Sequence, residues 1–163
     1  MPRVLVVSDA NVLIDVERGR LTALMFQLEH RFAVPDVLYD VELREHHPGL
    51  LRRGLRRMEL SEDSVRYVEL LSADARSKGV GRIDLFALAL AKQENCTLMT
   101  GDHLMRGLAV SEGREVHGTL WLTAEIFAAN LSTAARARRA YGAMRAAGRR
   151  LPARRSLRGR RVA

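Results

Sequence analysis

Two apolar runs that are expected to be strands each end in an aspartate that opens a helix. Asp9 follows the run Val4–Val7, and Asp102 follows Leu98 and Met99. Because an open parallel sheet binds ligands beyond the carboxyl ends of its strands, we expect both carboxylates at the ligand-binding edge. Aspartate is also a favoured helix N-cap, so either residue taken alone could simply begin its helix.

A third acid is expected at the start of the most apolar helix. Asp84 is the only charged residue between Arg82 and Lys92. Burying an unpaired carboxylate costs roughly several kcal/mol unless a cation or hydrogen-bond donors compensate. Asp84 is therefore either a ligand in a buried site or an exposed acid in the first turn, where the helix dipole favours it.

A fourth acid, Glu42, follows the second expected strand. It lies four residues after Leu38, so the two side chains share one face of the expected helix and Glu42 lies beside a core-directed leucine. Asp40 competes for the same role if the helix register shifts. Taken alone, Glu42 could equally be a solvated surface acid.

The four acids Asp9, Glu42, Asp84 and Asp102 would form one pocket in a sheet of this kind. Four carboxylates in one place repel, and their pKa values rise unless a cation lies among them. Oxygen ligands of this kind suit Mg²⁺ or Mn²⁺. Such a metal can activate a water molecule and stabilise charge on a phosphodiester. Thr100 could hydrogen-bond a carboxylate, a metal-bound water or a phosphate, or it could cap the next helix.

Short apolar strands alternate with helices along the whole chain, which predicts a parallel sheet covered by helices on both faces. We expect strands at residues 4–7, 32–34, 58–60, 97–100 and 115–117. We expect helices at residues 11–18, 21–29, 36–45, 61–77, 82–94, 102–112, 120–129 and 133–147, with Asp36 as the N-cap of the third.

The composition predicts one water-soluble domain. The chain has 163 residues, of which 47% are hydrophobic and 28% charged. No apolar run approaches the ~18 residues of a membrane-spanning helix, and the N-terminus lacks the pattern of a signal peptide. Cys96 is the only cysteine, which excludes intrachain disulfides and a multi-cysteine zinc site and fits the cytoplasm.

The positive charge is concentrated at the C-terminus. The net charge is +8, and residues 149–163 contain seven arginines and no acid. We therefore expect one domain over residues 1–147 and a flexible Arg-rich tail over residues 148–163 that adds affinity for RNA or a partner. A second arginine group, Arg52, Arg53, Arg56 and Arg57, is either an RNA path or a solvated face.

The pattern of these residues resembles the PIN domain. The matching motifs are Asp9-x-Asn11-Val12-Leu13-Ile14, Glu42-Leu43, Asp84-x-x-x-Leu88-Ala89 and Thr100-x-Asp102. The resemblance covers about residues 3–147, and the stretches 33–38, 118–122 and 144–152 resemble one uncharacterised PIN subgroup. It implies a three-layer α/β/α sandwich around a five-stranded parallel sheet.

The resemblance also implies an activity. PIN domains are metal-dependent ribonucleases, and many are VapC-type toxins of toxin–antitoxin pairs. Asp9, Glu42, Asp84 and Asp102 would then be catalytic metal ligands for Mg²⁺ or Mn²⁺, with Asn11 and Thr100 in support. RNA would be the substrate, an antitoxin a possible partner, and a homodimer the expected assembly.

One departure from the family pattern leaves an alternative open. Many PIN domains carry another acid shortly after the last aspartate, whereas His103, Leu104 and Met105 follow Asp102 here. A metal-poor RNA-binding or partner-binding module of the same fold is therefore the second hypothesis. A receiver-type signalling domain fits poorly, because Asp9 has no adjacent acid and no lysine follows Lys92.

Overall fold

The computed structural model describes residues 4–129, 131 and 133–147, so the Arg-rich tail predicted from residue 148 onward lies outside the described part. Five strands form one sheet in the order β3-β2-β1-β4-β5, and all four pairings are parallel. The strands are β1 (Leu5–Ser8), β2 (Arg31–Pro35), β3 (Arg56–Met58), β4 (Thr97–Met99) and β5 (Val116–His117). This confirms the predicted five-stranded parallel sheet.

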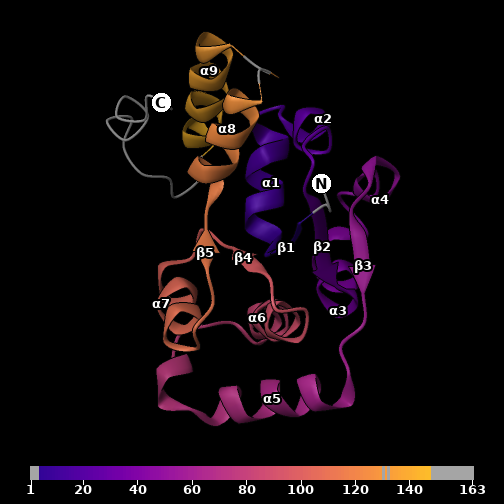
Figure 1. Ribbon diagram of the computed structural model, residues 1–163, viewed down its shortest axis with the longest axis vertical. Helices are drawn as coiled ribbons and strands as arrows, with labels where there is room; N and C mark the ends of the chain where they lie inside the picture. Colours follow the sequence, from indigo (N-terminus) through magenta and orange to yellow (C-terminus); the bar gives the residue numbers. More distant parts are fainter. Residues whose placement is uncertain (1–3, 130, 132, 148–163) are drawn as a thin grey trace.

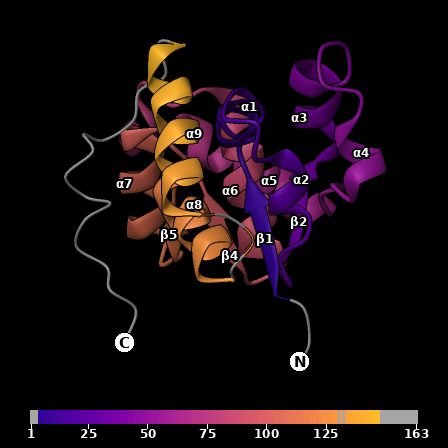
Figure 2. The ribbon, with the colours of Figure 1, turned by 90° about the horizontal axis from the view of Figure 1, so that it is seen from above.

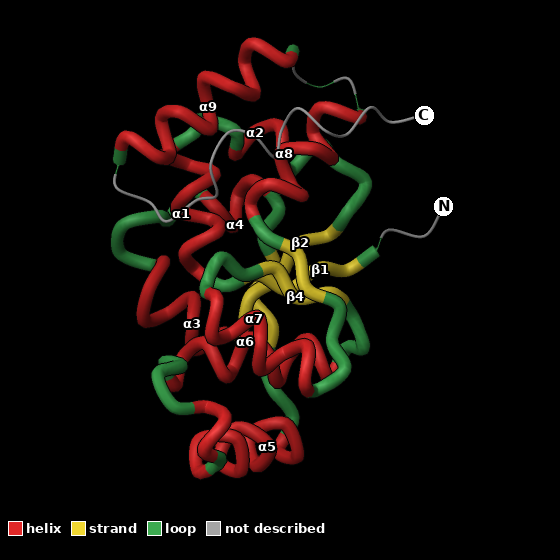
Figure 3. Tube along the Cα trace, turned by 90° about the vertical axis from the view of Figure 1, so that its left-hand side faces the viewer, coloured by secondary structure: helices red, strands yellow, loops and turns green. Residues whose placement is uncertain are grey.

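Helices cover both faces of the sheet (Figure 1). On one face lie α1 (Ala10–Arg18), α2 (Thr22–Met25), α8 (Thr119–Ala128) and α9 (Ala134–Ala146). On the other face lie α6 (Arg82–Gln93) and α7 (His103–Ser111), and α5 (Glu62–Ala73) packs outside α6, farthest from the sheet (Figure 3). Seen from above, α9 lies beside α1, with which it is in contact (Figure 2). The predicted three-layer architecture is thus confirmed.

The core lies where the central strands meet α6. Val7 of β1 and Leu98 of β4 are completely buried, as are Leu88 and Leu90 of α6. A helix that is apolar on nearly all sides needs cover on all sides, and α6 has the sheet on one side and α5 on the other. Among the described residues, no helix is long and apolar enough to cross a membrane.

The helix predicted over residues 36–45 forms with a different start and a different geometry. Pro35 occupies the N-cap position and Asp36 is the first residue of α3 (Asp36–Leu38), so the prediction of Asp36 as N-cap was wrong. The chain then continues as a π-helix, η1 (Tyr39–Leu43), in which the Arg44 N–H donates to the Tyr39 carbonyl at 2.8 Å. A short helix, α4 (Leu50–Arg53), follows before β3.

Three other predicted boundaries shifted. The helix expected over residues 21–29 is confined to α2, and the strand expected over residues 58–60 begins two residues earlier, at Arg56. β3 is the edge strand and carries exposed arginines, so its apolar pattern is weak. The helix expected over residues 61–77 splits into α5 and the 3-10 helix η2 (Ala75–Ser77), because the Asp74 side chain accepts from the Arg76 N–H and starts a new turn.

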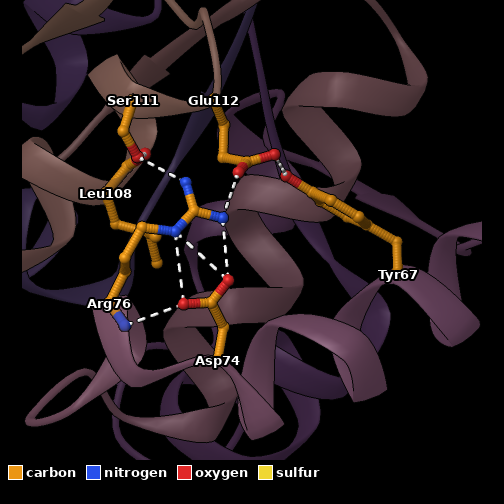
Figure 4. A network of polar contacts seen from close by, with 6 residues as sticks. All are labelled: Tyr67, Asp74, Arg76, Leu108, Ser111 and Glu112. Carbon is orange, nitrogen blue, oxygen red and sulfur yellow. Dashed lines mark hydrogen bonds and ion pairs between the residues drawn. The ribbon is translucent and has the colours of Figure 1, made fainter.

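A polar network ties the outer helix α5 to α7 (Figure 4). The Tyr67 hydroxyl donates to Glu112 at 2.6 Å, and Arg76 donates to Glu112 at 2.8 Å and to Asp74 at 2.9 Å. The Lys92 ammonium lies 3.9 Å from the centre of the Tyr67 ring. The network holds the C-terminal end of α7, the helix whose N-terminal end carries Asp102.

Replacing Glu112 with alanine is expected to lower the free energy of unfolding by about 1–2 kcal/mol. Most of the lost stability is due to the hydrogen bond from the Tyr67 hydroxyl. The ion pair with Arg76 contributes less, because the Arg76 side chain is half exposed and solvent screens its charge. The hydrogen bond from Tyr67, followed by that from Arg76, lowers the pKa of Glu112, so its contribution to stability falls as pH falls. Thermal denaturation checks this, with the exposed Glu45→Ala as control; equal melting temperatures for the two variants would contradict it.

Candidate active site

The strand order places a switch point between β1 and β4. From β1 the chain moves to β2 and β3 on one side, and it later returns to β4 and β5 on the other side. The crevice beyond the carboxyl ends at such a point is where open α/β sheets bind ligands. The Asp9 N–H donates to the Met99 carbonyl at 2.9 Å, so the ends of the two strands are adjacent.

Asp9 is buried at the end of β1, with only 1% of its surface exposed. Its Oδ1 accepts from the Val12 N–H at 2.9 Å, which caps α1, and its Oδ2 accepts from the Thr100 hydroxyl at 2.5 Å. Asp9 therefore caps a helix and is also held by the neighbouring strand end. Each carboxylate oxygen has a second lone pair, so these contacts leave acceptor capacity for a cation.

Thr100 links the acids that follow β1 and β4. Its hydroxyl donates to Asp9 and accepts from the Asp102 N–H at 3.1 Å. The cap of α7 is Asp102 itself, whose Oδ1 accepts from the Leu104 N–H at 2.8 Å and the Met105 N–H at 3.1 Å. Of the roles open to Thr100, the structure thus shows the hydrogen bond to a carboxylate.

The charge of Asp84 interacts electrostatically with those of the other three acids. It lies in the first turn of α6, where burial and the charge of Asp102 raise its pKa. The pKa of Glu42 is raised by burial and by the charge of Asp84. Burial is also the main reason that the pKa of Asp9 is raised to about 6; the Thr100 and Val12 hydrogen bonds oppose this effect, and the charge of Asp84 adds to it. Like charges within interaction range of one another account for this coupling.

Glu42, rather than Asp40, is the helix acid that interacts with this group. The Arg57 side chain holds Asp40 through Nε at 3.0 Å and Nη2 at 2.7 Å, and Arg44 adds a contact at 2.7 Å. The hydrogen bonds from Arg57 lower the pKa of Asp40. Asp40 is therefore neutralised by arginines, whereas Glu42 is coupled to Asp84.

The four acids offer the oxygen atoms that a hard divalent cation prefers. None of Asp9, Glu42, Asp84 and Asp102 forms an ion pair with a lysine, arginine or histidine in the described ranges. Burial, together with the charge of a neighbouring acid, raises the pKa values of Asp9, Glu42 and Asp84. In the part of the chain that the structure describes, no three His, Cys, Asp or Glu side chains are close enough together to hold an ion as they stand. The role of the four acids as metal ligands stays a prediction.

The remaining predicted site residues are all exposed. Asn11 is exposed in the first turn of α1. Arg52 and Arg53 are exposed on α4 and Arg56 on β3, whereas Arg57 is bound to Asp40. The RNA path proposed for these four arginines stays untested, and Arg57 has a partner within the protein.

Sequence reasoning missed one arginine beside the acids. The Nη2 of Arg106 lies 3.5 Å from the Thr100 carbonyl oxygen and against the backbone of Gly118. The only signal in the sequence is its position four residues, or about one helical turn, after Asp102.

Comparison with known proteins agrees with this geometry. The family model DUF3368, described as a PIN domain, matches residues 5–158. The structure is similar to that of a PilT N-terminus domain protein from the hyperthermophilic archaeon Sulfolobus solfataricus P2, with 14% sequence identity and a TM-score of 0.54. The similarity covers 75% of this chain and 92% of that one, and a search of curated proteins found no match. Because the family model matches nearly the whole sequence, the chain belongs to the PIN-domain family.

Proposed function

We propose that this protein is a Mg²⁺- or Mn²⁺-dependent endoribonuclease that hydrolyses phosphodiester bonds in RNA. The observation that carries the proposal is the coupling of Asp84 to Asp9, Glu42 and Asp102, with no ion pair to any of the four in the described ranges. PIN domains are generally nucleases and typically use divalent metals, which supports the same assignment.

The protein's own residues would prepare the site for this chemistry. Asp9, Glu42, Asp84 and Asp102 would hold a divalent cation, which supplies an activated water and stabilises charge on the phosphate. The Thr100 hydroxyl fixes the Asp9 carboxylate and the backbone of Asp102, so two of the ligands are already oriented. Asp9, with a pKa of about 6, is mostly ionised at neutral pH and is then ready to bind a cation.

The test is cleavage of a single-stranded RNA by the purified full-length chain. We expect cleavage in Mg²⁺ or Mn²⁺, loss of cleavage with EDTA, and recovery when the metal is restored. A single-stranded DNA of the same sequence shows whether the 2′-hydroxyl matters. Metal titration followed by thermal denaturation gives a second measurement, because a ligand that binds only the folded state raises the melting temperature.

The second candidate is a PIN module that binds RNA or a partner and cuts weakly or not at all. Two observations favour it: His103, Leu104 and Met105 stand where many PIN domains have a further acid, and no preformed cluster of three ligands exists among the described side chains. RNA binding without cleavage, and without any effect of Mg²⁺ or Mn²⁺ on melting temperature, would establish this alternative.

We also propose that the nuclease acts in the cytoplasm as a homodimeric toxin held in check by an antitoxin. A small adjacent gene for a DNA-binding protein, whose product abolishes RNA cleavage, would support this role. Sizing of the purified chain tests the dimer. A monomeric protein whose expression leaves cell growth unaffected would contradict both parts.

Removing residues 148–163 is expected to weaken RNA binding and leave the melting temperature nearly unchanged. The deleted segment holds seven arginines and no acid. For each phosphate that the tail no longer neutralises, the slope of log affinity against log salt should fall by about 0.7 for a single strand. Binding measured at two or more salt concentrations, for the full chain and a chain ending at Ala147, checks this. An unchanged slope with a large drop in melting temperature, or an altered oligomeric state, would contradict it.

A further inference from the structure

Arg106 lies next to the residue that joins two of the acids. It is on α7, and its backbone N–H donates to the Asp102 carbonyl at 2.9 Å. Its side chain turns toward the end of β4, where Nη2 donates to the Thr100 carbonyl at 3.5 Å. The hydroxyl of the same Thr100 donates to Asp9. Thr100 therefore connects the Arg106 guanidinium to Asp9, at the carboxyl edge of the sheet.

The guanidinium of Arg106 forms no ion pair with an acid in the described part of the chain. Among the described residues, no carboxylate lies within 4.0 Å of it, and the contact with Thr100 is its only hydrogen bond. Three arginines on other elements are paired with acids instead: Arg44 and Arg57 pair with Asp40, and Arg82 pairs with Glu69. A guanidinium carries five N–H donors in a planar fork that matches a phosphate group. Most of the donors of Arg106 are therefore available to a ligand.

Gly118 leaves the space that the guanidinium occupies. It is the N-cap of α8, and its φ of −129° is extended backbone that any residue can adopt. A Cβ atom built there would lie 3.0 Å from the Arg106 Nη2 and 3.3 Å from the Thr100 carbonyl oxygen. The backbone conformation does not require glycine at this position, but a side chain there would be in tight contact with Arg106 and Thr100.

We propose that Arg106 binds a backbone phosphate of the RNA substrate, with Gly118 leaving room for its guanidinium beside Thr100. The inference rests on the proposed nuclease function. A polyanion that approaches four carboxylates is repelled, and a fixed cation at the rim of the site reduces that repulsion and orients the chain. A guanidinium with free donors can make a bidentate contact to a phosphate, which is stronger than a single neutral hydrogen bond.

The experiment measures binding of a fluorescent single-stranded RNA at several salt concentrations, in an Asp9→Asn background so that the RNA stays intact. Arg106→Gln is expected to weaken binding about tenfold, as for loss of a charge-assisted hydrogen bond, and to lower the salt slope by about 0.7. Arg106→Lys keeps the charge and should keep the slope. Arg66→Gln is the control, since Arg66 lies on the outer helix α5 and pairs with Glu62.

The outcomes separate this inference from the function on which it rests. If the parent protein binds RNA and Arg106→Gln leaves both affinity and slope unchanged, the inference is wrong and the nuclease proposal stands. If the parent protein binds no RNA and the wild-type chain cuts none, both are wrong. A drop in melting temperature for Arg106→Gln with an unchanged slope would show that the arginine only supports the fold.

Gly118→Ala gives an independent check at a second residue. The added methyl should push the guanidinium away from Thr100 by a few tenths of an ångström and weaken RNA binding by less than Arg106→Gln does. In the Arg106→Gln background it should have no further effect, because the two changes act through one contact. Additive losses would overturn the proposed link between Gly118 and Arg106.

Discussion

Replacing Asp9 with asparagine is expected to raise the melting temperature of the metal-free protein and to abolish the RNA cleavage proposed for it. The pKa of Asp9 is about 6 in the folded protein against 3.8 for an ordinary aspartate. Between these two values the folded state binds more protons than the unfolded state, so stability falls as pH rises through this window. Above pH 6 the ionised Asp9 costs roughly 3 kcal/mol in total.

Asparagine removes that charge and keeps the size of the side chain. Its Oδ1 can still accept from the Val12 N–H, but Thr100 would have to accept a hydrogen bond from the new amide instead of donating one to Oδ2. We therefore expect a net gain of about 1–2 kcal/mol, less than the full cost of the charge. Thermal denaturation in EDTA at pH 5 and pH 7.5 checks this, and the gain should be smaller at pH 5.

The activity should change in the opposite direction. One of four expected ligand charges is lost, so added Mg²⁺ or Mn²⁺ should stabilise Asp9→Asn much less than the wild-type protein, and RNA cleavage should become undetectable. Asp63→Asn is the matched control, because the Asp63 side chain is 95% exposed on α5. Cleavage by Asp9→Asn at the wild-type rate would show that the acids are not the catalytic site.

Replacing Thr100 with valine is expected to be strongly destabilising despite the nearly equal size of the two side chains. The change leaves the buried Asp9 carboxylate without its 2.5 Å donor and the Asp102 N–H without its acceptor. Unsatisfied buried groups of this kind cost about 1–3 kcal/mol each, so we expect a loss of about 2–4 kcal/mol. Thr97→Val, at the start of β4, is the control, because the Thr97 hydroxyl makes no hydrogen bond with a described residue.

Thr100→Val should also shift the pH dependence of cleavage. The hydrogen bond from Thr100 lowers the pKa of Asp9, so its removal should raise that pKa above about 6. The acidic limb of the pH–rate profile should then move to higher pH, because Asp9 must be ionised to bind a metal. In the Asp9→Asn background the valine should cost less stability, since the carboxylate is already gone. Equal costs in both backgrounds would show that the hydroxyl acts independently of Asp9.

The sequence predicted the parts of this molecule that depend on local patterns. The fold follows from the alternation of short apolar strands with helices, and Asp9 and Asp102 were predicted because each lies within three residues of the end of an apolar strand. The apolar surroundings of Asp84 marked it in the same way. Each of these signals lies within about ten residues of the acid concerned.

The parts that depend on distant contacts or on irregular geometry could not be predicted in this way. Asp40 and Glu42 compete in any ideal helix, and the choice between them depends on the π-helix η1 and on an arginine from β3. A π-turn takes in one extra residue, which rotates the following side chains relative to an α-helix. Arg106 and Gly118 meet only because α7 and the start of α8 converge on the end of β4.

The strand order also determines when, during synthesis, the site can exist. The bond between Thr100 and Asp9 joins residues 91 positions apart, and β1 must wait for β4 before its second edge is paired. A nascent chain that has emerged only as far as β3 contains Asp9 and Glu42 but neither Asp84 nor Asp102. Long-range pairings of this kind form late in folding. The four acids therefore cannot come together until most of the chain has been made.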